Sequence, residues 1–103
     1  MNMPNNTSNT EEEYKDLLYR AVLSLRTRDE CRRLFEDLCT ISEIQAMSQR
    51  MQVALMLEKG NIYHEIGQAT GASTATISRV NKALRYGSDG YRVVLDRLKE
   101  NPR

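Results

Sequence analysis

The fold is decided by residues 62–85, IYHEIGQATGASTATISRVNKALR. Gly71 can adopt the positive φ that ends one helix, and Ser73 can cap the next. Two helices, capped by Asn61 and Ser73 and joined by a tight turn, predict a helix-turn-helix over residues 61–85, with Gly67 allowing close packing at the crossing. The side chains expected to face inward are Ile62, Ile66, Ile77, Val80 and Leu84.

The start of the second predicted helix consists of small, uncharged side chains, ASTATIS at 72–78, and no acidic residue occurs between Gln68 and Asp89. Such side chains can approach base edges in a major groove, while the basic residues behind them, including Arg85, can meet phosphates. For Tyr63 and His64, packing and solvent exposure are the alternatives to a phosphate contact. The predicted DNA-binding residues are Tyr63, His64, Thr74, Ala75, Ser78, Arg79 and Lys82.

The remainder of the chain predicts four further amphipathic helices and no strand, so the fold class is all-α. Three Thr-x-x-Glu capping boxes, at Thr10, Thr27 and Thr40, mark helix starts, and Gly60 ends the third helix. A flexible tail is expected over residues 1–9 and one helical domain over 10–99. Within that domain we expect dimerisation core helices over 10–60, the helix-turn-helix over 61–85 and a C-terminal helix over 88–99, which buries Tyr91, Val94, Leu95 and Leu98.

Composition excludes several classes of protein. The 103 residues make one small domain, whose low aromatic content of 6% favours a core shared between two copies. Cys31 and Cys39 are expected to be reduced, and the single histidine and the lack of a Cys-x-x-Cys pair argue against a metal. The sequence contains no paired carboxylates, phosphate-binding loop or activated nucleophile. We therefore expect neither an enzyme nor a cofactor. With no signal peptide or apolar span, we expect a cytoplasmic protein and no membrane partner.

The net charge of +1 hides an asymmetry along the chain. Residues 1–58 carry seven basic and ten acidic side chains, whereas residues 59–103 carry eight basic and four acidic ones. A basic half suits a polyanionic partner, although a solvated helix face would give the same count. The cations in question are Lys59, Arg79, Lys82, Arg85, Arg92, Arg97 and Lys99.

Residues 34–84 resemble the Trp repressor family, and within it the Trp-repressor-like subgroup of YerC/YecD type. The shared features are Leu38-Cys39-Thr40 followed by Glu43, an arginine one turn into the long helix, an apolar run closed by Gly60, and Gly71-Ala72 followed by Ala75-Thr76-Ile77-Ser78-Arg79. The resemblance implies a six-helix, intertwined homodimer. Such a dimer presents two recognition helices to double-stranded DNA about one helical turn, ~34 Å, apart.

The resemblance also implies a vestigial ligand pocket. Thr40, Arg50, Thr76 and Arg79 match family positions that hold tryptophan, but Val80 replaces a glycine and Ala83 replaces a serine. Overpacking by Val80 costs about 1 to 3 kcal/mol, and the lost hydrogen bond to an ammonium costs about 1.5 to 3 kcal/mol. L-tryptophan is therefore not expected to be the physiological effector. Arg50 and Arg79 would then be solvated, ion-paired or phosphate-binding side chains.

Three functions follow from these features. The leading one is a sequence-specific, homodimeric DNA-binding regulator. We expect it to be a repressor that does not respond to tryptophan. One alternative is a helical adaptor that binds another protein, and the other is a corepressor-dependent regulator that still binds an amino acid. The salt dependence of binding distinguishes a DNA partner from an apolar protein partner. The logarithm of the DNA affinity falls linearly with log[salt], with a slope of roughly 0.9 per neutralised phosphate.

Overall fold

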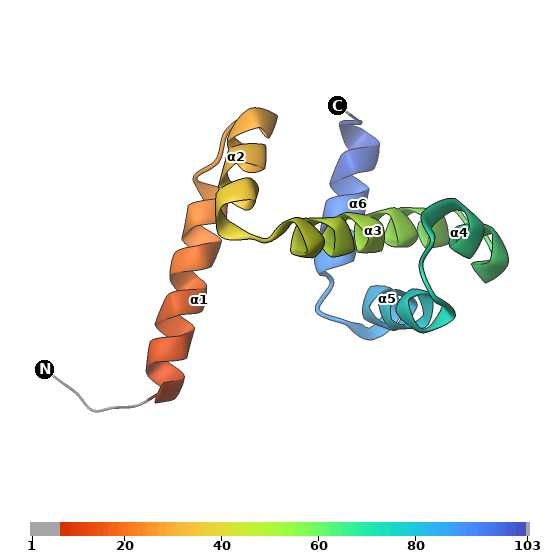
Figure 1. Ribbon diagram of the computed structural model, residues 1–103, viewed down its shortest axis with the longest axis horizontal. Coiled ribbons are helices and arrows are strands. Elements are labelled where there is room, and N and C mark those ends of the chain that lie inside the picture. Colours follow the sequence, from red (N-terminus) through yellow and green to blue (C-terminus); the bar gives the residue numbers. More distant parts are fainter. Residues whose placement is uncertain (1–6, 103) are drawn as a thin grey trace, which may run out of the picture. The chain divides into compact units, whose positions relative to one another are not determined.

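The computed structural model describes residues 7–102, and within them all regular structure is helical. The helices are α1 (Thr7–Leu23), α2 (Arg28–Leu38), α3 (Ile41–Glu58), α4 (Tyr63–Thr70), α5 (Thr74–Tyr86) and α6 (Gly90–Glu100) (Figure 1). The predicted all-α class and the six helices are confirmed. In the described part of the chain, no helix has both the length and the apolar character needed to cross a membrane.

The chain divides into two compact units, Met1–Thr40 and Ile41–Arg103. The sequence predicted one domain over residues 10–99, with its internal division after residue 60. The observed boundary precedes α3 because the apolar side chains of α3 form a core with those of α4, α5 and α6. The long helix therefore belongs structurally with the predicted helix-turn-helix.

In the first unit, α2 begins as predicted. The hydroxyl of Thr27 accepts a hydrogen bond of 3.1 Å from the backbone N–H of Glu30, and the Glu30 carboxylate accepts one of 2.8 Å from the N–H of Arg26. The prediction for α1 was wrong, because this helix begins at Thr7 and Thr10 lies inside it. Residues 7–9 of the expected tail are therefore helical, and residues 1–6 lie outside the described residues.

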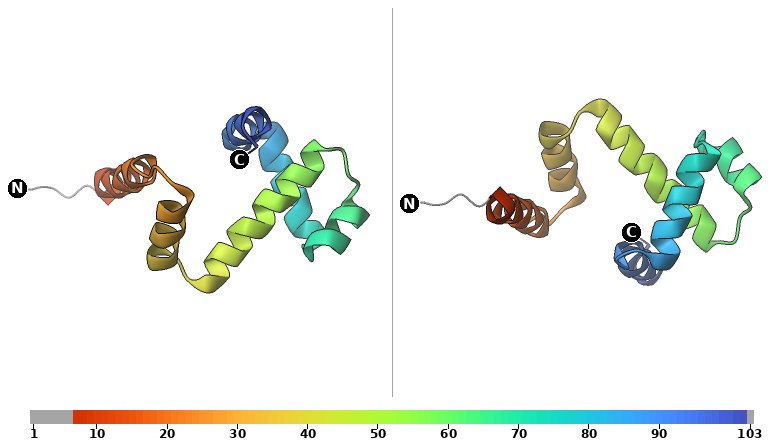
Figure 2. Two further views of the ribbon diagram at one scale, coloured as in Figure 1. Left: turned by 90° about the horizontal axis from the view of Figure 1, so that it is seen from above. Right: turned by 90° about the horizontal axis from the view of Figure 1, so that it is seen from below.

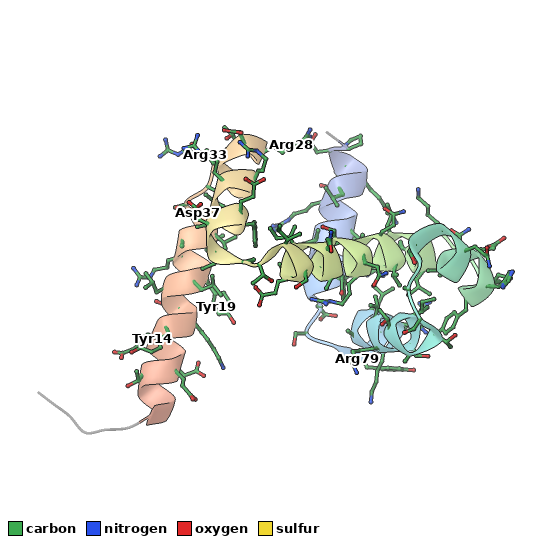
Figure 3. The ribbon with its side chains drawn as sticks, viewed as in Figure 1. Tyr14, Tyr19, Arg28, Arg33, Asp37 and Arg79 are labelled. Atoms are coloured by element: carbon green, nitrogen blue, oxygen red, sulfur yellow. The ribbon has the colours of Figure 1, made fainter. Side chains whose placement is uncertain are left out.

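The first unit has no buried side chain among residues 10–40. The stripe on α1 that was expected to face inward is largely exposed in the single chain, with Tyr14 68% and Leu17 58% accessible. Figure 3 labels Tyr14 and Tyr19 along this helix. Cys31 and Cys39 are half-buried free thiols, as predicted. An apolar stripe on a helix normally packs against another apolar surface. The stripe on α1 has no such surface within the described part of the single chain.

The second unit is built on α3, against which α4 and α5 pack. Figure 2 shows α5 crossing α3 in both views. The core lies at the C-terminal half of α3 and is entirely apolar. It comprises Val53, Ala54, Leu57, Ile66, Ala72, Ile77, Val80, Leu84 and Leu95. Full burial of a valine, leucine or isoleucine side chain stabilises the fold by about 1.5 to 3 kcal/mol.

Gly60 ends α3 as predicted and sets the direction of the chain into α4. Its φ is +88° and its N–H donates to the Leu57 carbonyl. The N–H of Asn61 donates to the Met56 carbonyl. This pair of bonds is the Schellman arrangement. The predicted cap of α4 was wrong by one residue, because Ile62 precedes the helix and is 63% exposed rather than inward-facing.

Gly67 does not have the role predicted for it. A methyl group at this position would meet only the carbonyl oxygen of Ala72, at an ordinary contact distance of 3.6 Å. The crossing of α4 and α5 is therefore not so close that it requires a glycine. Gly71 is different, since its φ of +74° lies in the left-handed region that other residues rarely adopt.

A carboxylate links the end of α3 to α6. Glu58, whose side chain is 15% exposed, accepts two hydrogen bonds from the guanidinium of Arg92, at 2.7 and 2.8 Å, and one from Lys99 at 3.0 Å. Arg92 also pairs with Asp96 at 3.2 Å. Hydrogen bonds from Arg92 and then Lys99 lower the pKa of Glu58 to about 2. Two of the cations that the sequence assigned to a polyanionic partner are thus already paired.

On α6 only Leu95 is buried, whereas Val94 and Leu98 are 43% and 47% exposed. The prediction that both face inward is therefore wrong for the single chain. The helix is held by Leu95, the half-buried Tyr91 and the ion pairs with Glu58. Its remaining apolar side chains are left without a cover.

The two glycines of α4 and the turn give a first prediction. Gly67→Ala should raise the free energy of unfolding by about 0.5 to 1 kcal/mol, because alanine favours the helix and fits the available space. Gly71→Ala should lower it by a comparable or larger amount, because the turn requires positive φ. Thermal or urea unfolding measures both variants. Destabilisation by Gly67→Ala would show that the crossing does need a glycine.

Glu58 gives a second prediction. Its pKa is about 2 in the folded chain and about 4.3 when unfolded, so its contribution to stability is complete above about pH 4.3 and is lost as the pH falls towards 2. At pH 7 the free energy of unfolding, measured with urea, should be higher for the wild type than for Glu58→Gln. This difference should shrink as the pH is lowered through the window. A difference that is independent of pH would contradict this assignment.

Candidate nucleic-acid interface

The turn between α4 and α5 is fixed by one threonine. The Thr70 hydroxyl donates to the Ile66 carbonyl at 2.7 Å and accepts from the N–H of Ala72 at 3.1 Å. Its own carbonyl accepts a bond of 3.1 Å from the side chain of Gln49 on α3. Together with the positive φ of Gly71, these bonds determine the angle at which α5 leaves the turn. The sequence identified the glycine but gave no signal for the bond from α3.

The start of α5 has the predicted geometry. Ser73 caps the helix, its hydroxyl accepting a bond of 3.1 Å from the N–H of Thr76. Ile77 and Val80 are 1% exposed and anchor the helix from beneath. The side chains on the opposite side, Thr74, Ala75 and Ser78, are all exposed. This arrangement leaves a rigid helix end covered with small, uncharged groups.

Positive charge follows directly along α5. Arg79, Lys82 and Arg85 are exposed, and none of them forms an ion pair with any residue of the described range 7–102. Arg79 is labelled in Figure 3, where it lies on the side of α5 away from α3. Because Arg92 and Lys99 are paired with Glu58, the unpaired positive charge is more concentrated on α5 than the sequence count suggested.

The first turn of α4 lies beside the middle of α5. Tyr63 and His64 are both exposed, as a phosphate contact would require. The Tyr63 oxygen accepts a hydrogen bond of 3.2 Å from the side chain of Asn81 on α5. Asn81 in turn accepts a bond of 3.3 Å from the Nε of Arg85. Asn81 could not be predicted from sequence, because an asparagine within a helix has no characteristic local pattern.

The expected ligand pocket stays a prediction as a set, and its residues lie in both units. Val80 is a core residue, and the Thr76 hydroxyl accepts a bond of 3.1 Å from Ser73. Arg50 is half-buried on α3 and Arg79 is exposed on α5, while Thr40 belongs to the other unit. Ala83 lines an apolar pocket of about 430 Å³ between α3, α5 and α6. The other residues around that pocket are Met51, Ser88, Gly90, Tyr91 and Val94.

Among the described residues, no group of three His, Cys, Asp or Glu side chains is placed to hold a metal ion. His64 lies in the first turn of α4, next to Glu65. The surface that combines exposure, small side chains and unpaired charge is therefore the one formed by α4 and α5.

Comparison with known proteins gives the same fold. The family model of the Trp repressor protein matches residues 13–99. The uncharacterized protein YerC of Bacillus subtilis (strain 168) is 58% identical over 85 residues, which cover 82% of each chain. A crystal structure of a candidate Trp repressor from Staphylococcus aureus superposes with a TM-score of 0.81 at 50% identity, covering 84% of this chain and 87% of that one. A TrpR-like protein from Eubacterium eligens ATCC 27750 gives the same TM-score at 52% identity, over 84% and 90%.

The six helices and the motif formed by α4 and α5 define an all-α helix-turn-helix protein. The chain belongs to the Trp repressor family, and within it resembles the YerC type. The predicted family and fold are confirmed.

Proposed function

We propose that this protein is a sequence-specific DNA-binding regulator that inserts α5 into the major groove and represses transcription. The observation that carries the proposal is the exposed, acid-free outer side of α5, with small side chains at its start and three unpaired cations behind them. Thr74, Ala75 and Ser78 would contact base edges, and Arg79 and Lys82 would contact phosphates. Tyr63 and His64 would approach the backbone from the first turn of α4.

The charge pattern favours DNA over a protein partner for this surface. A docking face for an apolar partner would present large hydrophobic side chains, whereas the outer face of α5 presents methyl, hydroxyl and cationic groups. Membership of the Trp repressor family supports the same choice. A helical adaptor remains the alternative outcome of the salt test, since its affinity would respond weakly to ionic strength.

We further propose that the regulator is a homodimer. The apolar side chains of α1 and of α6 are exposed in the single chain, including Leu17, Val94 and Leu98. A second copy would cover them, as family membership suggests, and would place two copies of α5 about 34 Å apart. Sites selected from a random DNA pool should then be two-fold symmetric, with half-sites about 10 base pairs apart.

Tryptophan is not part of the proposed function. Ala83 offers no hydroxyl to an ammonium group, and the Val80 side chain lies in the core. Arg50 and Arg79 then have no ring to enclose.

The DNA contact predicts the effect of a single charge. Thr74→Glu should lower affinity for a selected site by about a hundredfold or more, because it places a carboxylate beside base edges and phosphates. The fold should persist, since an acidic residue in the first turn of a helix is favourable. Binding is measured by fluorescence anisotropy and folding by circular dichroism.

Gln52→Glu on the exposed side of α3 is the matched control, because it adds the same charge outside the helix-turn-helix. It should bind nearly as the wild type does. Normal binding by Thr74→Glu would remove Thr74 from the interface. An affinity that hardly changes with salt would favour the adaptor.

A separate prediction concerns the effector. Calorimetric titration with L-tryptophan should show no binding in the micromolar range, and the amino acid should leave the affinity for selected DNA unchanged. A micromolar Kd would restore the corepressor-dependent alternative.

A further inference from the structure

The side chains of Tyr63, Asn81 and Arg85 form a hydrogen-bonded row that joins the first turn of α4 to the last turn of α5. Asn81 is half-buried, whereas Tyr63 and Arg85 are exposed. The bonds are 3.2 Å from the Asn81 amide nitrogen to the Tyr63 oxygen and 3.3 Å from the Arg85 Nε to the Asn81 oxygen. Since both bonds end on one amide group, the phenol and the guanidinium belong to the same small patch of surface.

The direction of these bonds follows from the chemistry of arginine. A guanidinium has only donors, so the side-chain oxygen of Asn81 must face Arg85 and its NH₂ group must face Tyr63. The Tyr63 oxygen is then an acceptor in this bond, and its own hydrogen remains available. The Nη groups of Arg85 also have no partner in the described residues. The row therefore presents several donors and one positive charge to solvent.

A surface that offers several donors and one positive charge favours an anion with several oxygen acceptors. In the proposed complex this anion is a phosphate of the DNA backbone. No carboxylate of the described chain pairs with Arg85, so a phosphate would not have to displace one.

We propose that Asn81 is a positioning residue that holds Tyr63 and Arg85 against one and the same backbone phosphate. This inference rests on the proposed DNA-binding function and adds to it a specific contact. Arg79 and Lys82, by contrast, are not held by any hydrogen bond from their side chains within the described residues, so each loses more rotamer freedom when it binds. Asn81 reduces that cost for Arg85 by fixing it before the DNA arrives.

The test is a scan of neutral methylphosphonate linkages through a selected DNA site, with affinity measured for each. For the wild type, one position in each half-site should lower affinity about tenfold, as the loss of charge-assisted hydrogen bonds predicts. Tyr63→Phe and Arg85→Gln should each weaken the effect of that same position. Asn81→Ala should weaken it too, although both contacting groups remain.

Lys82→Gln is the matched control, because it removes a neighbouring charge but leaves the row intact. It should keep the full effect at this position. Unfolding midpoints of Asn81→Ala and Tyr63→Phe should stay close to the wild type, since both hydrogen bonds are at the surface.

The inference is overturned if the wild type binds DNA but Tyr63→Phe and Arg85→Gln act on different phosphates. It is also overturned if Asn81→Ala retains the full effect. In both cases the proposed DNA binding stands. Failure of the wild type to bind any selected DNA would instead remove the proposed function, and the phosphate contact with it.

Discussion

The packing of α5 on α3 is the constraint on which the rest of the structure depends. Ile77, Val80 and Leu84 bring one side of α5 into the core, against Val53 and neighbouring side chains of α3. Because these residues recur at three- and four-residue spacing, their burial fixes the rotation of α5 about its own axis. That rotation leaves the small and basic side chains in solvent. The candidate interface is thus a direct consequence of how the core is filled.

The parts of this arrangement that could be predicted from sequence are those encoded over a few neighbouring residues. Ser73 caps α5, Gly71 adopts positive φ, and Ile77 is buried, because capping, turn conformation and amphipathic spacing are local properties. Capping boxes and apolar periodicity predicted the number and order of the helices, and the resemblance to a known family implied the same six-helix fold. The exposure of Thr74 and its neighbours followed once the buried side of α5 was known.

The features that sequence did not reveal depend on residues far apart in the chain. Glu58 pairs with Arg92 and Lys99 on another helix, and Asn81 bonds to Tyr63, which precedes it by 18 positions. No local pattern encodes such pairs. The role predicted for Gly67 was wrong because a glycine in a helix has two explanations. It can be required by a close contact or merely tolerated, and only the distance to neighbouring atoms distinguishes the two.

The ion pairs made by Glu58 also affect how the molecule meets a charged partner. Pairing Arg92 and Lys99 internally cancels positive charge on α6, whereas the cations of α5 remain uncompensated. Within the second unit, unpaired positive charge is therefore concentrated on α5. In the proposed DNA complex, this local charge would steer the α5 side of the unit towards the polyanion during encounter.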